Sequence, residues 1–247
     1  MTTLNHHERH LPLDLSYNLR DAGGYTTGDG RRVRWRRLLR SDSLHALTPA
    51  GQQTLRDHGL RTIIDLRRPS ETVRKPNVFA SAGQPIYRNL PMFDDASAAA
   101  IDAPATTLEE LYVRLIDMCR PQLHTIMTAV VAASSAPLLV HCAVGKDRTG
   151  LVVALTLGAL GVDEPTIAGD YALSYARLAP LFDIERPTIA AERRARFERM
   201  ILSPHTTMQH TLGYLAGQYG GIIGYLEAIG IGAAQIETLR ANLLERA

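Results

Sequence analysis

Residues 138–150 read LLVHCAVGKDRTG and are the most informative part of the chain. Three apolar residues lead into a glycine-containing loop, and a helical pattern follows from Arg148 to Leu160, with Gly161 placed to end it. A loop that runs into a helix N-terminus points several backbone N–H groups at one place, where the helix dipole also favours negative charge. The stretch therefore predicts a strand, an anion-binding loop and a helix in direct succession.

The residues inside this loop suit the chemistry of a phosphate ester. The field that favours a phosphate dianion also holds Cys142 as the thiolate, which is the form that attacks. Five residues separate Cys142 from Arg148, so one curl of the chain brings the guanidinium to face the sulfur across a bound phosphate, whose oxygens its planar fork can grip. Gly145 permits the tight turn. We expect the phosphate to lie against Ala143, Val144, Gly145 and Lys146.

Two neighbours are predicted to support the loop. The Thr149 hydroxyl can donate to the sulfur when it leaves a phosphocysteine intermediate, and His141 is expected to orient the loop from behind. A cysteine five residues before an arginine also arises by chance, and a buried cysteine is usually inert. The preceding strand, the glycine, the KDRTG tail and the helix start favour a catalytic loop, whereas Cys119 lacks all of this context.

The rest of the chain predicts an α/β fold with a central, mostly parallel sheet flanked by helices and a helix-rich final third. We interpret 1–247 as one domain, with a loose leader over 1–14 and a helical part from about 165 to 247 packed on the core. We expect strands over 62–66, 84–90 and 138–140. Two helices are expected to begin after capping residues, one after Thr48 and one after Thr107, which starts a capping box. Further helices are expected over 122–133, 148–160, 165–176, 187–202, 203–219 and 233–244.

Composition narrows the class of protein. The formal charge is +2 for 247 residues, which argues against a nucleic-acid partner, and we interpret the basic run from Arg31 to Arg40 as a solvated edge or turn. Two cysteines without metal-ligand spacing predict neither zinc nor a disulfide framework. The polar N-terminus resembles no signal peptide, and no segment approaches a membrane span. We therefore expect a cytoplasmic protein without metal or cofactor.

Beyond the loop, the sequence resembles bacterial tyrosine phosphatases that carry an HCxxGKDRTG loop. The likeness includes NLRDAGGY at 18–25, LRS at 39–41 and IDLR at 64–67 with Glu71 following, and weaker matches at 170–175 and 219–221. Ala143-Val144 and Trp35-Arg36 depart from the family pattern. The resemblance implies a tyrosine-phosphatase-like fold, and a lid formed by the arginine-rich helices between Asp170 and Leu202.

The resemblance also implies residue roles. Asp147, inside the loop, would protonate the leaving oxygen and later activate water; the alternative is that it pairs with Lys146, Arg148 or another basic group and stiffens the loop. The charge of Lys146 would admit multiply phosphorylated ligands. Asp65, at a strand end, would hold Arg148 or the loop, and Arg20 and Asp21 would brace the same side. Asp94 and Asp95 are the rival acids on an upstream loop.

Three functions remain open at this point. The first is a phosphatase for phosphotyrosine, with phosphoserine, phosphothreonine or phosphoinositides as further substrates. The second is a rhodanese-type sulfurtransferase, which also uses a cysteine in an anion-binding loop, and the KDRTG tail argues against it. The third is an inactive phosphate-binding module. The expected partner is accordingly a phosphorylated protein, a phosphoinositide or a small phosphoester, and the oligomeric state is open.

Overall fold

A five-stranded sheet places the loop-bearing strand at its centre. In the computed structural model, which describes residues 9–102 and 106–246, the strand order is β1-β3-β6-β4-β5. β1 is antiparallel to β3, and the other neighbours are parallel. The mostly parallel sheet predicted from the sequence is confirmed. The bounds are β1 Arg20–Asp21, β3 Leu38–Ser41, β4 Thr62–Asp65, β5 Ile86–Asn89 and β6 Leu138–His141.

The register of the sheet assembles the site. Every residue of β6 is buried, as expected of a strand covered on both faces. His141 pairs with Ser41 of β3 on one side and with Asp65 of β4 on the other. Three chain segments therefore reach the carboxyl edge of the sheet side by side, directly before Cys142, and this edge is where ligands of parallel sheets bind.

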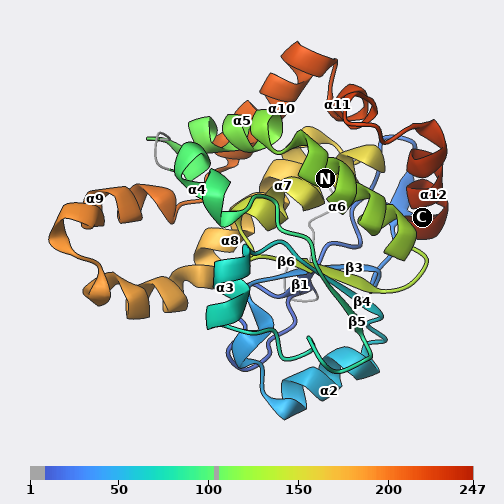
Figure 1. Ribbon diagram of the computed structural model, residues 1–247. Helices are drawn as coiled ribbons and strands as arrows, with labels where there is room; N and C mark the ends of the chain where they lie inside the picture. The colour runs from blue at the N-terminus through green and yellow to red at the C-terminus, as the bar shows by residue number, and fades with distance from the viewer. Residues whose placement is uncertain (1–8, 103–105, 247) are drawn as a thin grey trace.

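Helices cover both faces of the sheet (Figure 1). Leu39, Ile63 and Leu139 pack toward α2, whereas Leu38, Ile64 and Leu138 face a larger core shared with α5–α8 and the C-terminal helices. Alternate strand residues thus enter opposite layers. The bounds are η1 Leu44–Ala46, α2 Pro49–Asp57, α3 Pro69–Arg74, α4 Asp95–Asp102, α5 Leu108–Met118, α6 Arg120–Ala133 and α7 Asp147–Ala159.

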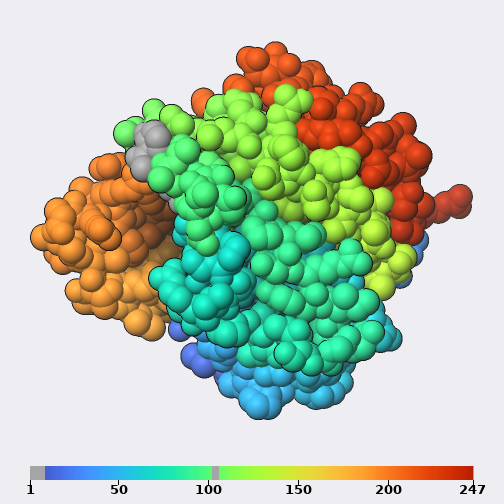
Figure 2. Space-filling model, viewed as in Figure 1, coloured from blue at the N-terminus to red at the C-terminus, as the bar shows by residue number. Residues whose placement is uncertain are grey.

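The C-terminal third is helical as predicted, with different boundaries. Its elements are α8 Glu164–Glu185, η2 Arg186–Thr188, α9 Ala191–Met200, α10 His205–Tyr219, α11 Ile222–Ala228, α12 Ala233–Leu243 and β7 Leu244–Arg246, which pairs with β2 Arg31–Val33. The predicted end of α8 at Ala176 is wrong, because the helix continues through Pro180. Its last turns and α9 protrude from the body (Figures 1 and 2). Leu178, Phe182 and Ile201 form a small cluster there that also touches Val144 of the loop.

Two sequence interpretations need correction. Of the leader predicted to be loose, residues 1–8 lie outside the described part, but Arg9 is buried against the rings of Tyr25 and Trp35 and donates to the carbonyl of Asp21. The run from Arg31 to Arg40 is not wholly solvated, because Arg40 is buried in an ion pair with Asp170. Within the described residues, no helix combines the length and the apolar character that crossing a membrane requires.

Candidate active site

The loop between β6 and α7 is held open by donors behind it. Asn18 Nδ2 donates to the carbonyls of Val144 and Gly145, at 3.0 Å each, and the Ser43 N–H donates to the carbonyl of Ala143 at 3.0 Å. Arg40 Nη2 adds a bond of 2.8 Å to the carbonyl of Gly145. In a planar trans peptide the N–H points opposite to the carbonyl, so the N–H groups of the following residues point to the concave side. This arrangement forms an anion cradle.

Gly145 is required where the loop passes β3. Its φ is +67°, and a Cβ built there would lie 2.2 Å from the carbonyl oxygen of Ser41. Both the left-handed conformation and the backbone contact exclude a side chain. The turn predicted at this position is therefore present, and the loop lies directly against the end of β3.

Cys142 lies at the base of the cradle and is 1% exposed. The Thr149 hydroxyl, one turn into α7, is buried and has no hydrogen-bond partner among the described residues, so the predicted bond to the sulfur is not formed in this structure. An unpaired buried hydroxyl carries an energetic cost. The Thr149 hydroxyl is therefore available to donate a hydrogen bond to a ligand in the cradle or to the Cys142 thiolate.

His141 supports the loop from behind, and its surroundings define its tautomer. The Phe79 N–H donates to Asn77 Oδ1, which turns Asn77 Nδ2 toward His141 Nε2 at 2.9 Å. Nε2 must accept this bond, so the proton is on Nδ1, which lies 3.1 Å from the Cys142 carbonyl. Burial lowers the pKa of His141, in agreement with a neutral ring. Asn77 was not recognised from the sequence, because it lies 64 residues upstream in an unremarkable loop.

The Arg148 side chain is oriented by Glu71. Its Nη1 and Nη2 bind the two carboxylate oxygens at 2.7 and 2.9 Å, and Nη1 also donates to the Leu66 carbonyl at 3.3 Å. Burial opposes the charge on Arg148, but these bonds raise its pKa. Glu71 occupies the end edge of the guanidinium, so the side edge, formed by Nε and Nη2, remains for another oxyanion. The centre of the Phe93 ring lies 5.6 Å from the guanidinium carbon of Arg148, and the ring limits the movement of the guanidinium.

The structure changes the role predicted for Asp65. Its carboxylate binds Nε and Nη2 of Arg67, at 3.0 and 2.7 Å, and accepts from the Tyr87 hydroxyl at 2.8 Å. It therefore does not hold Arg148. Asp65 Oδ2 also lies 3.5 Å from His141 Nε2, which places it behind the loop. The expectation that it supports the loop remains compatible with this position.

Asp147 lies at the opposite end of the loop from Ala143. Its Oδ1 accepts from the Tyr112 hydroxyl at 3.2 Å and lies 3.4 Å from Lys146 Nζ. Burial raises the pKa of Tyr112 well above its usual value, so the phenol stays a donor. A cavity of about 120 Å³ lies between Asp147, Arg148 and Phe93. Asp147 therefore has access to space beside the guanidinium, next to the cradle.

The Lys146 side chain points away from the anion cradle. It is 1% exposed, and its ammonium donates to the carbonyl of Met200 and, at 2.9 Å, to that of Leu202. These carbonyls lie at the end of α9. In this structure the charge of Lys146 therefore fastens the helical protrusion to the loop and does not line the phosphate position, so its backbone alone can contribute there.

The upstream aspartates have other structural roles. Asp94 accepts from the Ser97 N–H at the start of α4, at 2.7 Å, and Asp95 accepts from the Ser70 N–H at 3.0 Å. Neither lines the cavities beside the loop. Their geometry does not favour them as acids over Asp147.

A buried charged network ties the C-terminal half to the loop. Asp170 of α8 binds Arg20 at 3.3 Å and Arg40, and accepts from the Tyr25 hydroxyl at 3.0 Å. Burial alone would raise the pKa of Asp170, but the two arginines lower it. Arg40 in turn contacts the Gly145 carbonyl. Arg20 thus braces the loop side as expected, and the weak likeness at 170–175 was the one sequence signal for Asp170.

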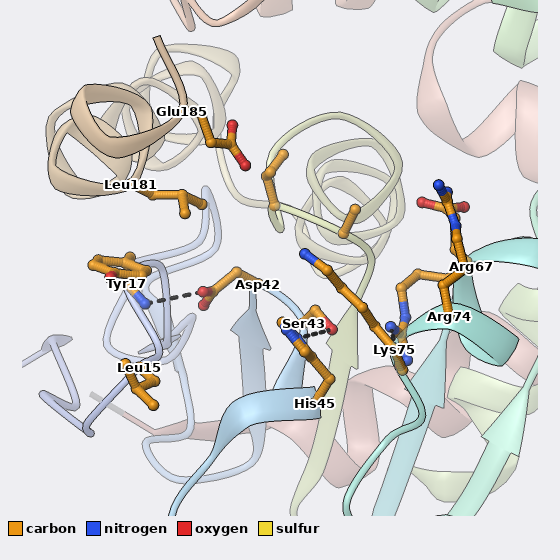
Figure 3. Close-up of a pocket in the computed structure, with 13 residues that line it drawn as sticks. Leu15, Tyr17, Asp42, Ser43, His45, Arg67, Arg74, Lys75, Leu181 and Glu185 are labelled. Carbon is orange, nitrogen blue, oxygen red and sulfur yellow. Dashed lines mark hydrogen bonds between the residues drawn. The ribbon is translucent and has the colours of Figure 1, made fainter. Parts of the chain in front are cut away.

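A cavity of about 320 Å³ opens above the loop (Figure 3). Its lining comes from the loop, from the segment before β1, from η1 and its approach, from α3 and the residues beside it, and from the end of α8. The lining residues are Leu15, Tyr17, Asp42, Ser43, His45, Arg67, Glu71, Arg74, Lys75, Ala143, Val144, Leu181 and Glu185. The volume is that of a site for a small molecule or a side chain. Among the described residues, no group of three histidine, cysteine or acidic side chains is placed to hold a metal ion.

Comparisons with known proteins agree with this geometry. The chain is 30% identical to a tyrosine-protein phosphatase of Nostoc commune over 83% of this chain and 74% of that one. It is 28% identical to the triple specificity protein phosphatase PtpB of Mycobacterium tuberculosis, over 94% and 98%. A solved structure of TpbA from P. aeruginosa aligns with a TM-score of 0.39 at 15% identity, over 81% and 90%, which carries no further argument. The model of the tyrosine phosphatase family matches residues 11–245, and the chain belongs to this family of phosphatases.

Proposed function

We propose that this phosphatase cleaves phosphomonoesters, with phosphotyrosine as the main substrate, through a phosphocysteine intermediate on Cys142. The observation that supports this most is the guanidinium of Arg148, which Glu71 holds by one edge while the other edge is left beside the cradle. A loop that only stabilised the fold would have no use for a guanidinium edge left beside an anion cradle, whereas this edge suits a second oxyanion. 

In the first step, the Cys142 thiolate attacks phosphorus, an S–P bond forms, and the ester P–O bond breaks. The electron pair of that bond leaves with the alcohol oxygen, which takes its proton from Asp147. The cradle N–H groups and the side edge of Arg148 bind the equatorial oxygens, whose charge is stabilised in the transition state. Thr149 can donate to the sulfur when it leaves again.

In the second step, Asp147, now a carboxylate, accepts a proton from water, whose oxygen attacks phosphorus. The S–P bond breaks, the thiolate returns, and inorganic phosphate is released. The Tyr112 hydroxyl and the Lys146 ammonium both contact Asp147 Oδ1 and so hold the side chain in position for this proton transfer. Both steps balance without metal or cofactor.

The apolar lining of the large cavity by Tyr17, Val144 and Leu181 supports an aryl leaving group. Activity on further phosphoesters is a second candidate, because a relative of nearly equal length is named a triple specificity phosphatase. We also propose a reducing, cytoplasmic location, since Cys142 must remain a thiol; both cysteines are free in the structure.

Phosphate release from a phosphotyrosine peptide, short-chain phosphoinositides and p-nitrophenyl phosphate tests this proposal. We expect Cys142→Ser and Arg148→Ala to abolish turnover, orthovanadate to inhibit the wild type competitively, and chelators to have no effect. Activity above a few percent in Cys142→Ser would overturn the choice of nucleophile. Loss of activity in EDTA that added metal restores would overturn the mechanism.

A further inference from the structure

The cavity above the loop has two walls of different character. Three residues with basic side chains, His45, Arg74 and Lys75, form what we call the basic wall. Leu15, Tyr17, Val144 and Leu181 form what we call the apolar wall. Figure 3 shows Lys75 directed into the cavity, with Glu185 of α8 across from it. The end of the loop at Ala143 and Val144 therefore lines a space with cations on the α3 side and the Glu185 carboxylate on the α8 side.

Most other charges around the cavity already have partners. Asp42 accepts from the Ser16 hydroxyl and from the N–H groups of Tyr17 and Asn18, at 2.9 to 3.0 Å. Arg67 is paired with Asp65, and Glu71 with Arg148. For Arg74, Lys75 and Glu185, the structure shows no ion pair within the described residues, although Arg74 Nε donates to the Ser70 carbonyl at 3.3 Å. Two cations on the α3 side thus remain to meet a ligand.

The position of Lys75 is fixed by the machinery of the site. Its N–H donates to the Glu71 carbonyl at 3.0 Å, and its carbonyl accepts from Arg67 Nη1 at 2.8 Å. Glu71 orients Arg148, so the backbone that carries Lys75 and the phosphate-gripping guanidinium share one anchor. The fold therefore fixes the distance between the cradle and the basic wall. A fixed distance is what a site needs if it is to bind a phosphoryl group and a second anionic group of the same substrate.

The use of lysine in this chain points the same way. Among 27 basic residues, Lys75 and Lys146 are the two lysines. Lys146 is buried and donates to carbonyls of the protrusion, so it cannot bind a second anionic group in this structure. Lys75 is exposed and lines the cavity. Burial, together with the charges of Lys75 and Arg67, lowers the pKa of His45, as expected where cations converge.

We propose that Lys75, assisted by Arg74, binds an acidic side chain adjacent to the phosphotyrosine of a peptide substrate. This inference rests on the proposed function. The apolar wall favours a peptide over a phosphoinositide, because a phenyl ring fills such a wall whereas the hydroxyls of an inositol ring would lose their hydrogen bonds there. Glu185, on the opposite side, disfavours a second negative charge on the α8 side and so gives the bound peptide a direction.

Two matched phosphotyrosine peptides test the inference, one with glutamate and one with glutamine beside the phosphotyrosine. We expect wild-type kcat/KM to favour the glutamate peptide about two- to fivefold at low salt, as for one charge pair near the surface, with the preference shrinking as salt is added. Lys75→Met should bring the ratio close to one, Lys75→Arg should keep it, and Glu185→Gln should increase it. Arg32→Met, an exposed cation on β2 outside the cavity lining, should leave it unchanged.

Equal kcat/KM on the two peptides in the wild type, or a preference that survives Lys75→Met, would overturn the inference. If both peptides release phosphate in a manner that depends on Cys142, the proposed function still stands. If neither peptide releases phosphate, both the proposed function and the inference are wrong. A soluble short-chain phosphoinositide bisphosphate serves as the third substrate: a loss there in Lys75→Met, with the peptide ratio intact, would show that the peptide is the wrong occupant.

Discussion

Replacing Glu71 by glutamine tests how the structure orients its phosphate-binding arginine. Burial alone would raise the pKa of Glu71, but the hydrogen bonds and charge of Arg148 lower it from 4.5 to about 2. The side chain is 12% exposed, so solvent screens the pair little. A shift of this size corresponds to about 3 kcal/mol of stability. Glu71→Gln should therefore lower the free energy of unfolding at pH 7 by about that amount.

The pH dependence has a defined sign. A carboxyl whose pKa is depressed in the folded state stabilises the protein above its unfolded pKa, and this contribution is lost as pH falls toward the folded value. The gap between wild type and Glu71→Gln should thus be full at pH 7 and begin to close below about pH 4.5, toward about 2. Urea unfolding of both proteins at a series of pH values measures this difference in the free energy of unfolding. Glu227→Gln, an exposed glutamate on α11, is the control and should change stability by less than about 0.5 kcal/mol.

The same substitution should lower activity. The amide oxygen of glutamine can still accept one of the two bonds, but its NH₂ group would face the other guanidinium nitrogen, donor against donor, so the end-on pair is lost. Small errors in the position of a catalytic group cost on the order of 10²-fold in rate, and we expect a loss of that order in kcat/KM on p-nitrophenyl phosphate. A Glu71→Gln variant with wild-type stability and wild-type activity at pH 7 would refute the role given to this pair.

Three further predictions concern the loop itself. If Asp147 is the acid, Asp147→Asn should lose roughly 10²–10⁴-fold in kcat/KM, which reports the first step, on phosphotyrosine but much less on an activated aryl phosphate; equal losses on both would indicate a structural role. Lys146→Met should release the end of α9 and speed proteolysis of residues 186–203, measured by mass spectrometry, whereas an unchanged cleavage rate would contradict the contact with Met200 and Leu202. Gly145→Ala should lower the melting temperature and abolish orthovanadate binding, because its Cβ meets the Ser41 carbonyl; retained binding would show that the loop can shift.

Local sequence rules predicted much of the frame. Thr48 and Pro49 begin α2 as expected, with Thr48 accepting from the Gly51 N–H, and the β-branched run at 62–65 forms β4. These features depend on residues that are close together in the chain, so they can be predicted from a single sequence. The helix expected over 203–219 begins at His205 instead, and the Ser203 hydroxyl accepts from the Tyr175 N–H of α8. The strand β7 and the helices α3, α4 and α11 were missed, being short and without strong periodicity.

Long-range partners were the harder part of the site. The motif residues Cys142, Asp147 and Arg148 could be chosen from local context. The partners of the site are separated from it by 35 to 127 residues, as Tyr112 is from Asp147 and Asn18 from Gly145, and no local pattern encodes such pairing. Lys146 illustrates the limit: the sequence places its charge beside the phosphate, whereas folding brings carbonyls 54 and 56 residues away to its ammonium.

In the proposed mechanism, Cys142 carries the phosphoryl group during turnover. Rapid acid quench during hydrolysis of a phosphotyrosine peptide, followed by digestion and mass spectrometry, measures this directly. We predict that the peptide containing Cys142 gains the mass of one phosphoryl group and that Cys142→Ser shows none. With an activated aryl phosphate, whose leaving group needs no acid, Asp147→Asn should accumulate more of this species than wild type because its hydrolysis is slowed. A wild-type enzyme that turns over substrate with the Cys142 peptide unmodified at every quench time, in both wild type and Asp147→Asn, would contradict the account.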